Sequence, residues 1–172
     1  RGRKLAEENV QKICEALDEE THMVFITAGM GGGTGTGASP IIAREARKKG
    51  ILTVGIVTIP FLFERERQID KALDGLDALA KEVDALLVIN NQRLLEIYPE
   101  QSVIEAFKRA DKTLSTAVSS ITEIISMHGR VNLDFEDVRT VLSEGGVAVM
   151  STGFAEGENR VTRAIDEALH SP

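Results

Sequence analysis

The stretch GMGGGTGTGA, residues 29–38, holds six glycines and two threonines and directly follows a short apolar run, Met23–Ala28. Glycine loses more conformational freedom on folding than any other residue, so this stretch must serve close approach or an unusual backbone conformation. The apolar run lacks polar alternation, which is typical of a strand buried on both faces. Ser39 and Pro40 then predict a helix start, with serine as N-cap and proline at the first helical position. Strand, glycine turn and helix together predict an anion-binding loop of exposed backbone amides.

The glycine stretch fits two common nucleotide-binding motifs poorly. The phosphate loop of many NTPases needs a lysine after its last glycine, and no lysine occurs between Thr21 and Arg47. A dinucleotide fingerprint can be placed on Gly33–Ala38, but it needs an acidic residue at the end of the next strand. No acid occurs there before Glu64, which argues against a dinucleotide site. An NAD(P)-binding Rossmann domain is therefore kept only as a minor alternative. A merely mobile turn is disfavoured because two well-defined elements flank the glycines.

Two further apolar runs, 51–59 and 85–89, predict buried strands, and helical patterns separate them. Strands that alternate with helices predict an α/β fold, a parallel sheet with helices on both faces. In the helical pattern 65–82 the residues Ile69, Leu73, Leu76 and Leu79 fall on one face. The expected helices are 3–19, 40–49, 65–82, 101–127, 135–143 and 158–170, and a fourth strand is expected at 145–151.

The helical pattern 101–127 is unusually long, about 40 Å at the standard rise of an α-helix. That length suits a connector between two bodies better than a helix on one small sheet. We therefore expect residues 1–100 to form a partial nucleotide-binding domain and 101–127 a central helix. Residues 128–172 would then begin a second subdomain.

Charge and composition exclude several classes of protein. The formal net charge of −7 argues against a nucleic-acid binder that neutralises phosphates. A single cysteine suits a reducing compartment, and neither a membrane-spanning run nor a signal peptide is evident. The chain starts Arg-Gly-Arg-Lys without an initiator methionine, so we expect a piece of a longer protein.

Residues 31–37, GGGTGTG, resemble the signature of the tubulin/FtsZ family, and in particular its bacterial cell-division GTPases. The resemblance covers essentially the whole chain and implies a Rossmann-like GTPase domain whose long helix leads to a second subdomain. Further segments resemble the family in its own order: ILTVGIVTIPFLFE at 51–64, INNQRLL at 89–95, EAFKRAD at 105–111 and NLDFEDVRTVLSEGG at 132–146.

The resemblance implies that the glycine loop holds the phosphates of GTP or GDP. Mg²⁺ is expected there through water and phosphate oxygens, with no metal ligand supplied by the chain itself. The implied phosphate-binding residues are Gly31, Gly32, Gly33, Thr34, Gly35, Thr36 and Gly37.

For the ribose, the resemblance implies a contact by Glu64. Relatives carry an arginine four residues further on, where this chain has Gln68. Arg65 or Arg67 could take over that contact, or it could be lost. The less favoured alternative is that Glu64 is only a solvated helix cap.

For the guanine base, the resemblance implies Asn91, Phe107 and Asp111. Phe107 and Asp111 are four residues apart, so they share one helix face. A ring on which the base stacks, and a carboxylate that accepts from its N1–H and amino group, provide the chemistry that guanine selection needs. The less favoured alternative is that Phe107 is only a core residue and Asp111 only a solvated one.

The acidic segment suggests catalysis only through the resemblance. By itself Asp134 is a good helix N-cap and Asp137 a first-turn acid. In the family this loop enters the nucleotide pocket of the next subunit, which implies that Asn132, Asp134 and Asp137 orient and polarise the attacking water. Positioning that water in line is what phosphoryl transfer requires of a protein.

The resemblance further implies a GTP-hydrolysing protein that polymerises head to tail into the bacterial division ring, in the cytoplasm at mid-cell. Membrane anchors and regulators of the ring would bind parts outside this chain, and neither nucleic-acid binding nor membrane insertion is expected. The family's earlier strand and first glycine loop have no counterpart here, so we expect weak GTP binding and poor hydrolysis by this chain alone. A nucleotide-binding regulator that does not polymerise is the alternative.

Overall fold

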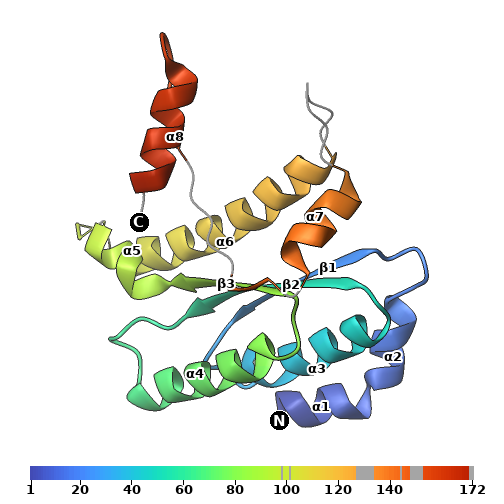
Figure 1. Ribbon diagram of the computed structural model, residues 1–172. Coiled ribbons are helices and arrows are strands. Elements are labelled where there is room, and N and C mark those ends of the chain that lie inside the picture. Colours follow the sequence, from blue (N-terminus) through green and yellow to red (C-terminus); the bar gives the residue numbers. More distant parts are fainter. Residues whose placement is uncertain (98, 101, 127–133, 144, 148–152, 171–172) are drawn as a thin grey trace.

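A parallel sheet forms the centre of the molecule. The computed structural model describes residues 1–97, 99–100, 102–126, 134–143, 145–147 and 153–170. Within these residues the sheet has four strands in the order β1-β2-β3-β4 (Figure 1). The register pairs Met23 with Leu52, Val54 with Ala85, and Ala85 with Gly146. The strand bounds are β1 Met23–Gly29, β2 Leu52–Ile59, β3 Ala85–Asn90 and β4 Gly146–Val147.

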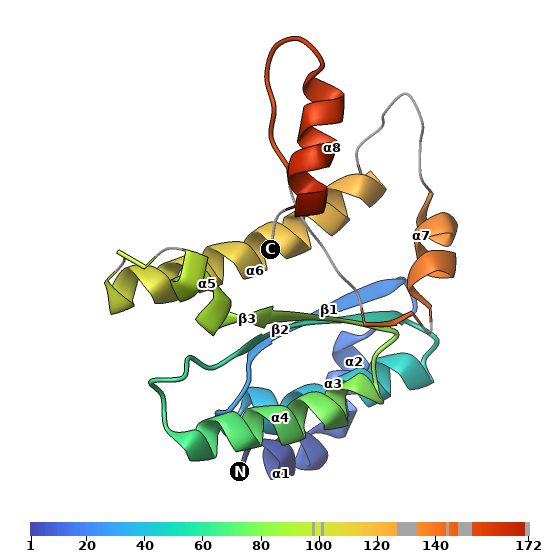
Figure 2. The ribbon, with the colours of Figure 1, turned by 60° about the vertical axis from the view of Figure 1, so that its left-hand side comes forward.

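Helices cover both faces of the sheet, as the sequence predicts. On one face lie α1 (Gly2–Glu8), α2 (Val10–Ala16), α3 (Gly35–Lys48) and α4 (Glu66–Ala80) (Figure 1). On the other lie α5 (Asn91–Ile97), α6 (Val103–Ser126) and α7 (Phe135–Leu142), while α8 (Arg160–His170) stands beyond α6 (Figure 2).

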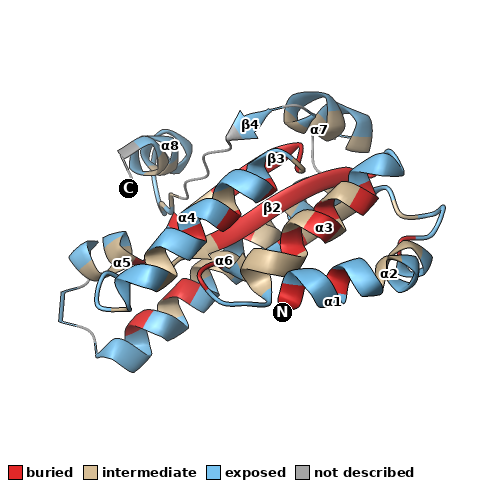
Figure 3. Cartoon of the chain, turned by 90° about the horizontal axis from the view of Figure 1, so that it is seen from below, coloured by how far each residue is buried: buried red, intermediate tan, exposed pale blue. Residues whose placement is uncertain are grey.

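Each face of the sheet has its own apolar core. Ile26 and Val57 meet Ala43 of α3 and Leu79 of α4 on the first face. On the second face, Val54, Ile56, Ala85, Leu87 and Ile89 pack against Ala117 of α6. Figure 3 shows the result from the first face: β2 is buried from Leu52 to Val57, and the helices bury only their inner sides.

Strand β1 is less buried than the sequence predicts. Its apolar run indicates burial on both faces, but of its residues only Ile26 is buried. The reason is position, because β1 lies at the edge of the described sheet whereas β2 has a strand on either side.

The predicted helix 3–19 is divided into α1 and α2. The break lies at Asn9, whose side-chain Nδ2 donates to the carbonyl of Leu5 over 2.9 Å. An asparagine side chain that competes for backbone partners weakens a helix at that point.

The predicted start of α3 at Ser39 and Pro40 is also wrong. The helix begins at Gly35, and Ser39 lies inside it with its hydroxyl donating to the Gly35 carbonyl over 2.6 Å. Tertiary contact outweighs the capping signal here, because the first turn lies directly against the end of β1. A Cβ atom on Gly35 would come within 2.5 Å of the Gly29 carbonyl oxygen.

The buried face of α4 is turned relative to the prediction. Leu79 is fully buried, but Leu73 is 47% exposed. Ala72 and Gly75 take the inward positions instead, because α3 packs close enough that a Cβ atom on Gly75 would lie 2.3 Å from Thr36 Cγ2.

The predicted strands 51–59 and 85–89 are confirmed as β2 and β3. The predicted helices 101–127, 135–143 and 158–170 are confirmed as α6, α7 and α8 within the described residues. The 24-residue α6 spans about 36 Å. Of the predicted strand 145–151, the described part is β4, and residues 148–151 lie outside the described residues. No helix in the described part of the chain is long and apolar enough to span a bilayer.

The two leucines of α4 provide a direct test of this packing. We expect Leu79→Ala to lower the free energy of unfolding by about 3 kcal/mol, because it leaves a cavity between α4 and the sheet. Leu73→Ala, the matched control on the exposed side, should cost less than about 1 kcal/mol. Urea unfolding followed by circular dichroism measures both values, and equal losses would contradict the described face of α4.

Candidate functional site

The segments that follow β1, β2 and β3 meet at one edge of the sheet, on the left-hand side of Figure 1. They are the glycine loop 30–34, the turn 60–65 and the start of α5. Parallel strands bring their carboxyl ends together in this way, and ligands of open α/β sheets bind outside that edge. The predicted phosphate and ribose residues and Asn91 lie on these segments or in the first turns of the helices that follow them, whereas Phe107 and Asp111 lie in the first half of α6.

The glycine loop has a fixed base. The backbone amide of Met30 donates to the Thr58 carbonyl over 2.9 Å, and the amide of Gly31 donates to Thr36 Oγ1 over 2.9 Å. Gly31 has φ +96°, and a Cβ atom there would lie 2.8 Å from the Gln68 carbonyl oxygen. Only glycine fits this position, so the loop is anchored against both β2 and α4.

The tip of the same loop is open to solvent on one side only, because Gly2 of α1 packs against Gly33 and Thr34, and a Cβ atom on Gly2 would lie 2.1 Å from the Gly33 carbonyl oxygen. Gly32, Gly33 and Thr34 are exposed. A Cβ atom on either Gly32 or Gly33 would meet nothing within 4 Å. The tip leads into the N-terminus of the 14-residue α3, whose first turn carries no acidic side chain. An anchored loop whose tip is exposed on one side, at a helix N-terminus, can offer backbone amides to an anion.

Gln68 lies beside this loop, and Glu64 lies in the turn that precedes α4. One carboxylate oxygen of Glu64 accepts from the Phe61 amide over 3.0 Å and closes the turn 61–64. The N-cap of α4 is Arg65, so the alternative of Glu64 as a helix cap is wrong. The Gln68 carbonyl faces Gly31 as described above, which places the first turn of α4 against the loop.

A cluster of aromatic rings joins the turn 60–65 to α6. Phe61 is fully buried and stacks with Phe63, their centroids 4.9 Å apart. Phe107 of α6 meets Phe61 edge-on at 4.9 Å and is itself 42% exposed, so it is not purely a core residue. The cluster was not predicted, because the stacking of Phe61 on Phe63 depends on the turn 61–64 and their contact with Phe107 depends on the position of α6.

Asn91 is an unusual member of the same edge. Its side chain is buried, and among the described residues its Oδ1 has no hydrogen-bond partner. A buried acceptor without a partner is costly, so it calls for a ligand or solvent group. The neighbouring Gln92 accepts from the Leu62 amide over 3.2 Å and ties α5 to the turn 60–65.

The start of α6 is fixed by its own cap. The Ser102 hydroxyl and backbone amide both donate to Glu105, over 2.6 and 2.8 Å. These bonds lower the pKa of the Glu105 carboxyl, which therefore keeps its charge and its cap to lower pH than an isolated glutamate. The cap holds the turn that carries Phe107, and Asp111 follows one turn later, exposed.

The predicted catalytic acids lie elsewhere. Asp134 and Asp137 form a reciprocal capping box at the start of α7, because the Asp137 amide donates to Asp134 over 2.9 Å and the Asp134 amide donates back over 3.4 Å. The N-cap role considered from the sequence is confirmed, while Asn132 lies outside the described residues.

Helix α7 packs against the amino ends of the strands. Its Phe135 ring lies 5.9 Å from His22, which precedes β1. Its Arg139 donates to the carbonyl of Gly50, which precedes β2. The acids and the glycine loop of one chain therefore lie at opposite ends of the sheet.

Metal-ligating side chains do not gather in the part of the chain that the structure describes. Among those residues, no cluster of three or more His, Cys, Asp or Glu side chains could hold a metal ion.

Comparison with known proteins identifies similar chains. The model of the family "Tubulin/FtsZ family, GTPase domain" matches residues 1–99. The cell division protein FtsZ of Porphyromonas gingivalis is 54% identical over 172 residues, covering 100% of this chain and 37% of that protein. The FtsZ of Bartonella bacilliformis is 50% identical, covering 99% of this chain and 29% of its own length. The chain thus spans about a third of these curated relatives.

Solved structures agree with these matches. The structure described as an empty FtsZ dimer from M. jannaschii has a TM-score of 0.93 and 42% identity, covering 99% of this chain and 50% of its own. A CetZ from Methanosaeta thermophila, at 22% identity and a TM-score of 0.78, covers 98% of this chain and 48% of its own and shares the fold.

The capping box generates a prediction about α7. Asp134→Ala removes the acceptor for the Asp137 amide and should destabilise the helix by about 1 kcal/mol. Asp134→Asn keeps a side-chain oxygen in place and should change the stability by only a few tenths of a kcal/mol. Hydrogen exchange of the backbone amides 137–142 reports the local stability, and an equal loss in the two variants would show that the cap does not hold α7.

Proposed function

This chain belongs to the tubulin/FtsZ family, and we propose that it carries the nucleotide-binding part of a GTP-hydrolysing, filament-forming cell-division protein. The observation that supports this most is the glycine loop, whose anchored base and exposed residues 32–34 lie at the edge where the loops of a parallel sheet meet. Domain limits of 1–100 for nucleotide binding, 101–127 for the central helix and 128–172 for the start of a second subdomain are part of the proposal.

The phosphates of GTP would lie over Gly32, Gly33 and Thr34. Their backbone amides and the N-terminus of α3 provide positive partial charge, and the first turn of α3 carries no acidic side chain. Gly31, Gly35, Thr36 and Gly37 would shape the loop. The Thr36 hydroxyl already holds the Gly31 amide, so its contribution is to the loop rather than to the ligand. Mg²⁺, held by phosphate oxygens and water, would neutralise part of the phosphate charge.

The base and ribose would occupy the space between α5 and α6. The buried, unpartnered Oδ1 of Asn91 would accept a hydrogen bond from guanine, and the exposed part of Phe107 would stack on the ring. Asp111 would accept from the N1–H and amino group. For the ribose, Glu64 would act together with Gln68, whose side-chain amide is a neutral hydrogen-bond donor. The alternative is that Arg65 or Arg67 makes this second contact with a charged donor.

Hydrolysis would require a second copy of the chain. Asp134 and Asp137 lie at the opposite end of the sheet from the glycine loop, so they can serve only a nucleotide bound by another subunit. A head-to-tail contact would bring the amino edge of one sheet to the carboxyl edge of the next, and so place the acids of one subunit beside the nucleotide of its neighbour. Such a contact repeats into a filament. Asn132, Asp134 and Asp137 would then orient the attacking water and accept its proton.

At the level of the cell, the proposed role is the cytoplasmic division ring at mid-cell. Its membrane anchors and regulators would bind parts of the protein outside this chain. The apolar face of α8, formed by Val161, Ile165 and Leu169, is exposed and would pack within the second subdomain.

The proposed phosphate site at the loop tip can be tested by adding a single methyl group there. Gly33→Ala should leave the free energy of unfolding unchanged, because nothing lies within 4 Å of the added Cβ. It should weaken GTP binding by about tenfold or more, because the methyl group takes the place of a phosphate oxygen. Isothermal titration of the full-length protein measures the affinity. The control is Gly29→Ala, whose Cβ would make an ordinary contact 3.6 Å from Thr58; unaltered affinity in Gly33→Ala would refute the phosphate site.

The division of the active site between two copies can be tested by mixing variants. Asp134→Asn in the full-length protein should lower GTP turnover by about a hundredfold while GTP binding is kept, and Glu136→Gln, in the same turn, should turn over GTP normally. Mixed with Gly33→Ala subunits, which supply intact acids, Asp134→Asn should regain turnover.

Sedimentation with and without GTP reports whether filaments form. Mixed filaments without recovered turnover would contradict the shared site. A protein that binds GTP but never sediments would support the alternative of a regulator that does not polymerise.

A further inference from the structure

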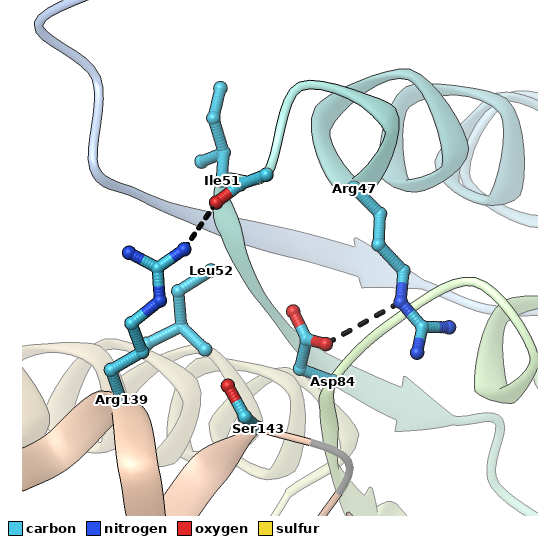
Figure 4. Close-up of a pocket in the computed structure, with 7 residues that line it drawn as sticks. Arg47, Ile51, Leu52, Asp84, Arg139 and Ser143 are labelled. Atoms are coloured by element: carbon cyan, nitrogen blue, oxygen red, sulfur yellow. Dashed lines mark hydrogen bonds and ion pairs between the residues drawn. The ribbon is translucent and has the colours of Figure 1, made fainter.

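Helix α3 connects the two distant parts of the proposed site within one chain. Its first residue, Gly35, directly follows the exposed tip of the glycine loop. Beyond its other end, the carbonyl of Gly50 accepts a hydrogen bond from Arg139 of α7. Figure 4 shows the Arg139 side chain extending from α7 to the start of β2, where a dashed line marks this bond. The phosphate loop and the acid-bearing helix are thus attached to opposite ends of a helix about 21 Å long.

The Gly50 end of α3 is rigidly built. Gly50 has φ +72°, and its amide donates to the Arg47 carbonyl over 2.9 Å. The Ile51 amide donates to the Ala46 carbonyl over 3.2 Å, which completes a Schellman motif. Ala43 and Ala46 are fully buried against the sheet. The carbonyl that Arg139 holds therefore follows any displacement of the end of α3.

Helix α7, in contrast, packs against the core of the second face through Leu142 at its C-terminal end, while its N-terminal half is held by Phe135 and Arg139. None of its residues is buried. Phe135 meets His22, and the Arg139 guanidinium lies over the Phe135 ring at 5.9 Å, so Arg139 contacts both the helix start and Gly50. A cavity of about 300 Å³ beside Arg139, also lined by Arg47, Asp84 and Ser143, leaves the guanidinium room to move. The orientation of Asp134 and Asp137 thus depends strongly on Arg139.

We propose that α3 transmits the nucleotide state of a subunit to the orientation of that subunit's own acids, with Arg139 as the positioning residue. This coupling rests on the proposed function. Bound phosphates attract the amides of the loop tip and thereby displace α3 together with Gly50. Because Arg139 is hydrogen-bonded to the Gly50 carbonyl, it then rotates α7 and the capping box. The acids serve the next subunit, so the nucleotide in one subunit sets the rate of hydrolysis in its neighbour. By linkage, docking of the acids alters the nucleotide affinity of their own subunit.

The proposal is tested by hydrogen exchange on the full-length protein, kept below its assembly concentration, with GDP or a slowly hydrolysed GTP analogue bound. We expect exchange of the amides 135–142 to differ between the two nucleotides by about fivefold or more. Arg139→Gln should abolish that difference and keep the response of residues 30–38. Arg139→Lys, which can still donate to the Gly50 carbonyl, should retain part of it.

The matched control is Arg47→Gln. It removes the same charge from the same cavity and breaks an ion pair with Asp84 at 3.4 Å, but that pair does not involve α7. The control should keep the nucleotide-dependent difference. A merely structural role of Arg139 would raise exchange throughout α7 equally with either nucleotide, and the difference would persist.

The outcomes separate the two claims. If residues 30–38 do not respond to nucleotide in the native protein, the proposed phosphate site fails, and the coupling with it. If they respond but residues 135–142 do not, only the coupling is refuted. If the difference at 135–142 persists in Arg139→Gln, the signal travels by another route, such as α6, and the role of Arg139 and α3 is refuted; the native comparison and Arg139→Lys decide the matter even if Arg139→Gln fails to fold.

Discussion

In a parallel sheet all strands run the same way, so the loops that follow them gather at one edge and the residues that precede them gather at the other. In this chain the first edge receives the glycine loop, the aromatic cluster and Asn91. The second receives α7, through His22 and Gly50. The chemistry proposed here depends on this polarity, because no single chain can bring the two edges together, whereas a head-to-tail neighbour can.

The local structure of the acids gives them two compatible functions. Asp134 and Asp137 satisfy each other's backbone amides at the start of α7, which stabilises a helix without any buried residue. The same bonds hold both carboxylates at an exposed helix end. The residues that define α7 are therefore the residues that it would present to a neighbouring subunit, and a change in its orientation alters the presented surface.

The sequence predicts those features of the fold that depend on one segment at a time. Buried strands β2 and β3, the length of α6 and the cap at Asp134 follow from local pattern and composition. The burial of β1, the start of α3 and the inward face of α4 do not, since each depends on a neighbour distant in the sequence. For α3 that neighbour is the end of β1, against which only a glycine at position 35 fits.

In the candidate site, too, some features follow from the local sequence and others depend on neighbours that are distant in the sequence. The glycine loop could be identified from composition, but the anchoring of Gly31 by Gln68 and Thr36 needs three elements to be in place. The contacts of Phe61, Phe63 and Phe107 join a turn to a distant helix, and the separation of the acids from the loop follows from the register of the sheet. Residue types could be read from the sequence, whereas their grouping at two edges required the fold.

The most direct measurement is a structure of the full-length protein assembled with a slowly hydrolysed GTP analogue. We expect the phosphates over Gly32, Gly33 and Thr34 of one subunit, with Asp134 and Asp137 of its neighbour within reach of the γ-phosphate through one water. Phosphates bound away from the glycine loop, or acids of the neighbour that face away from them, would show that the two edges of the sheet do not form one site.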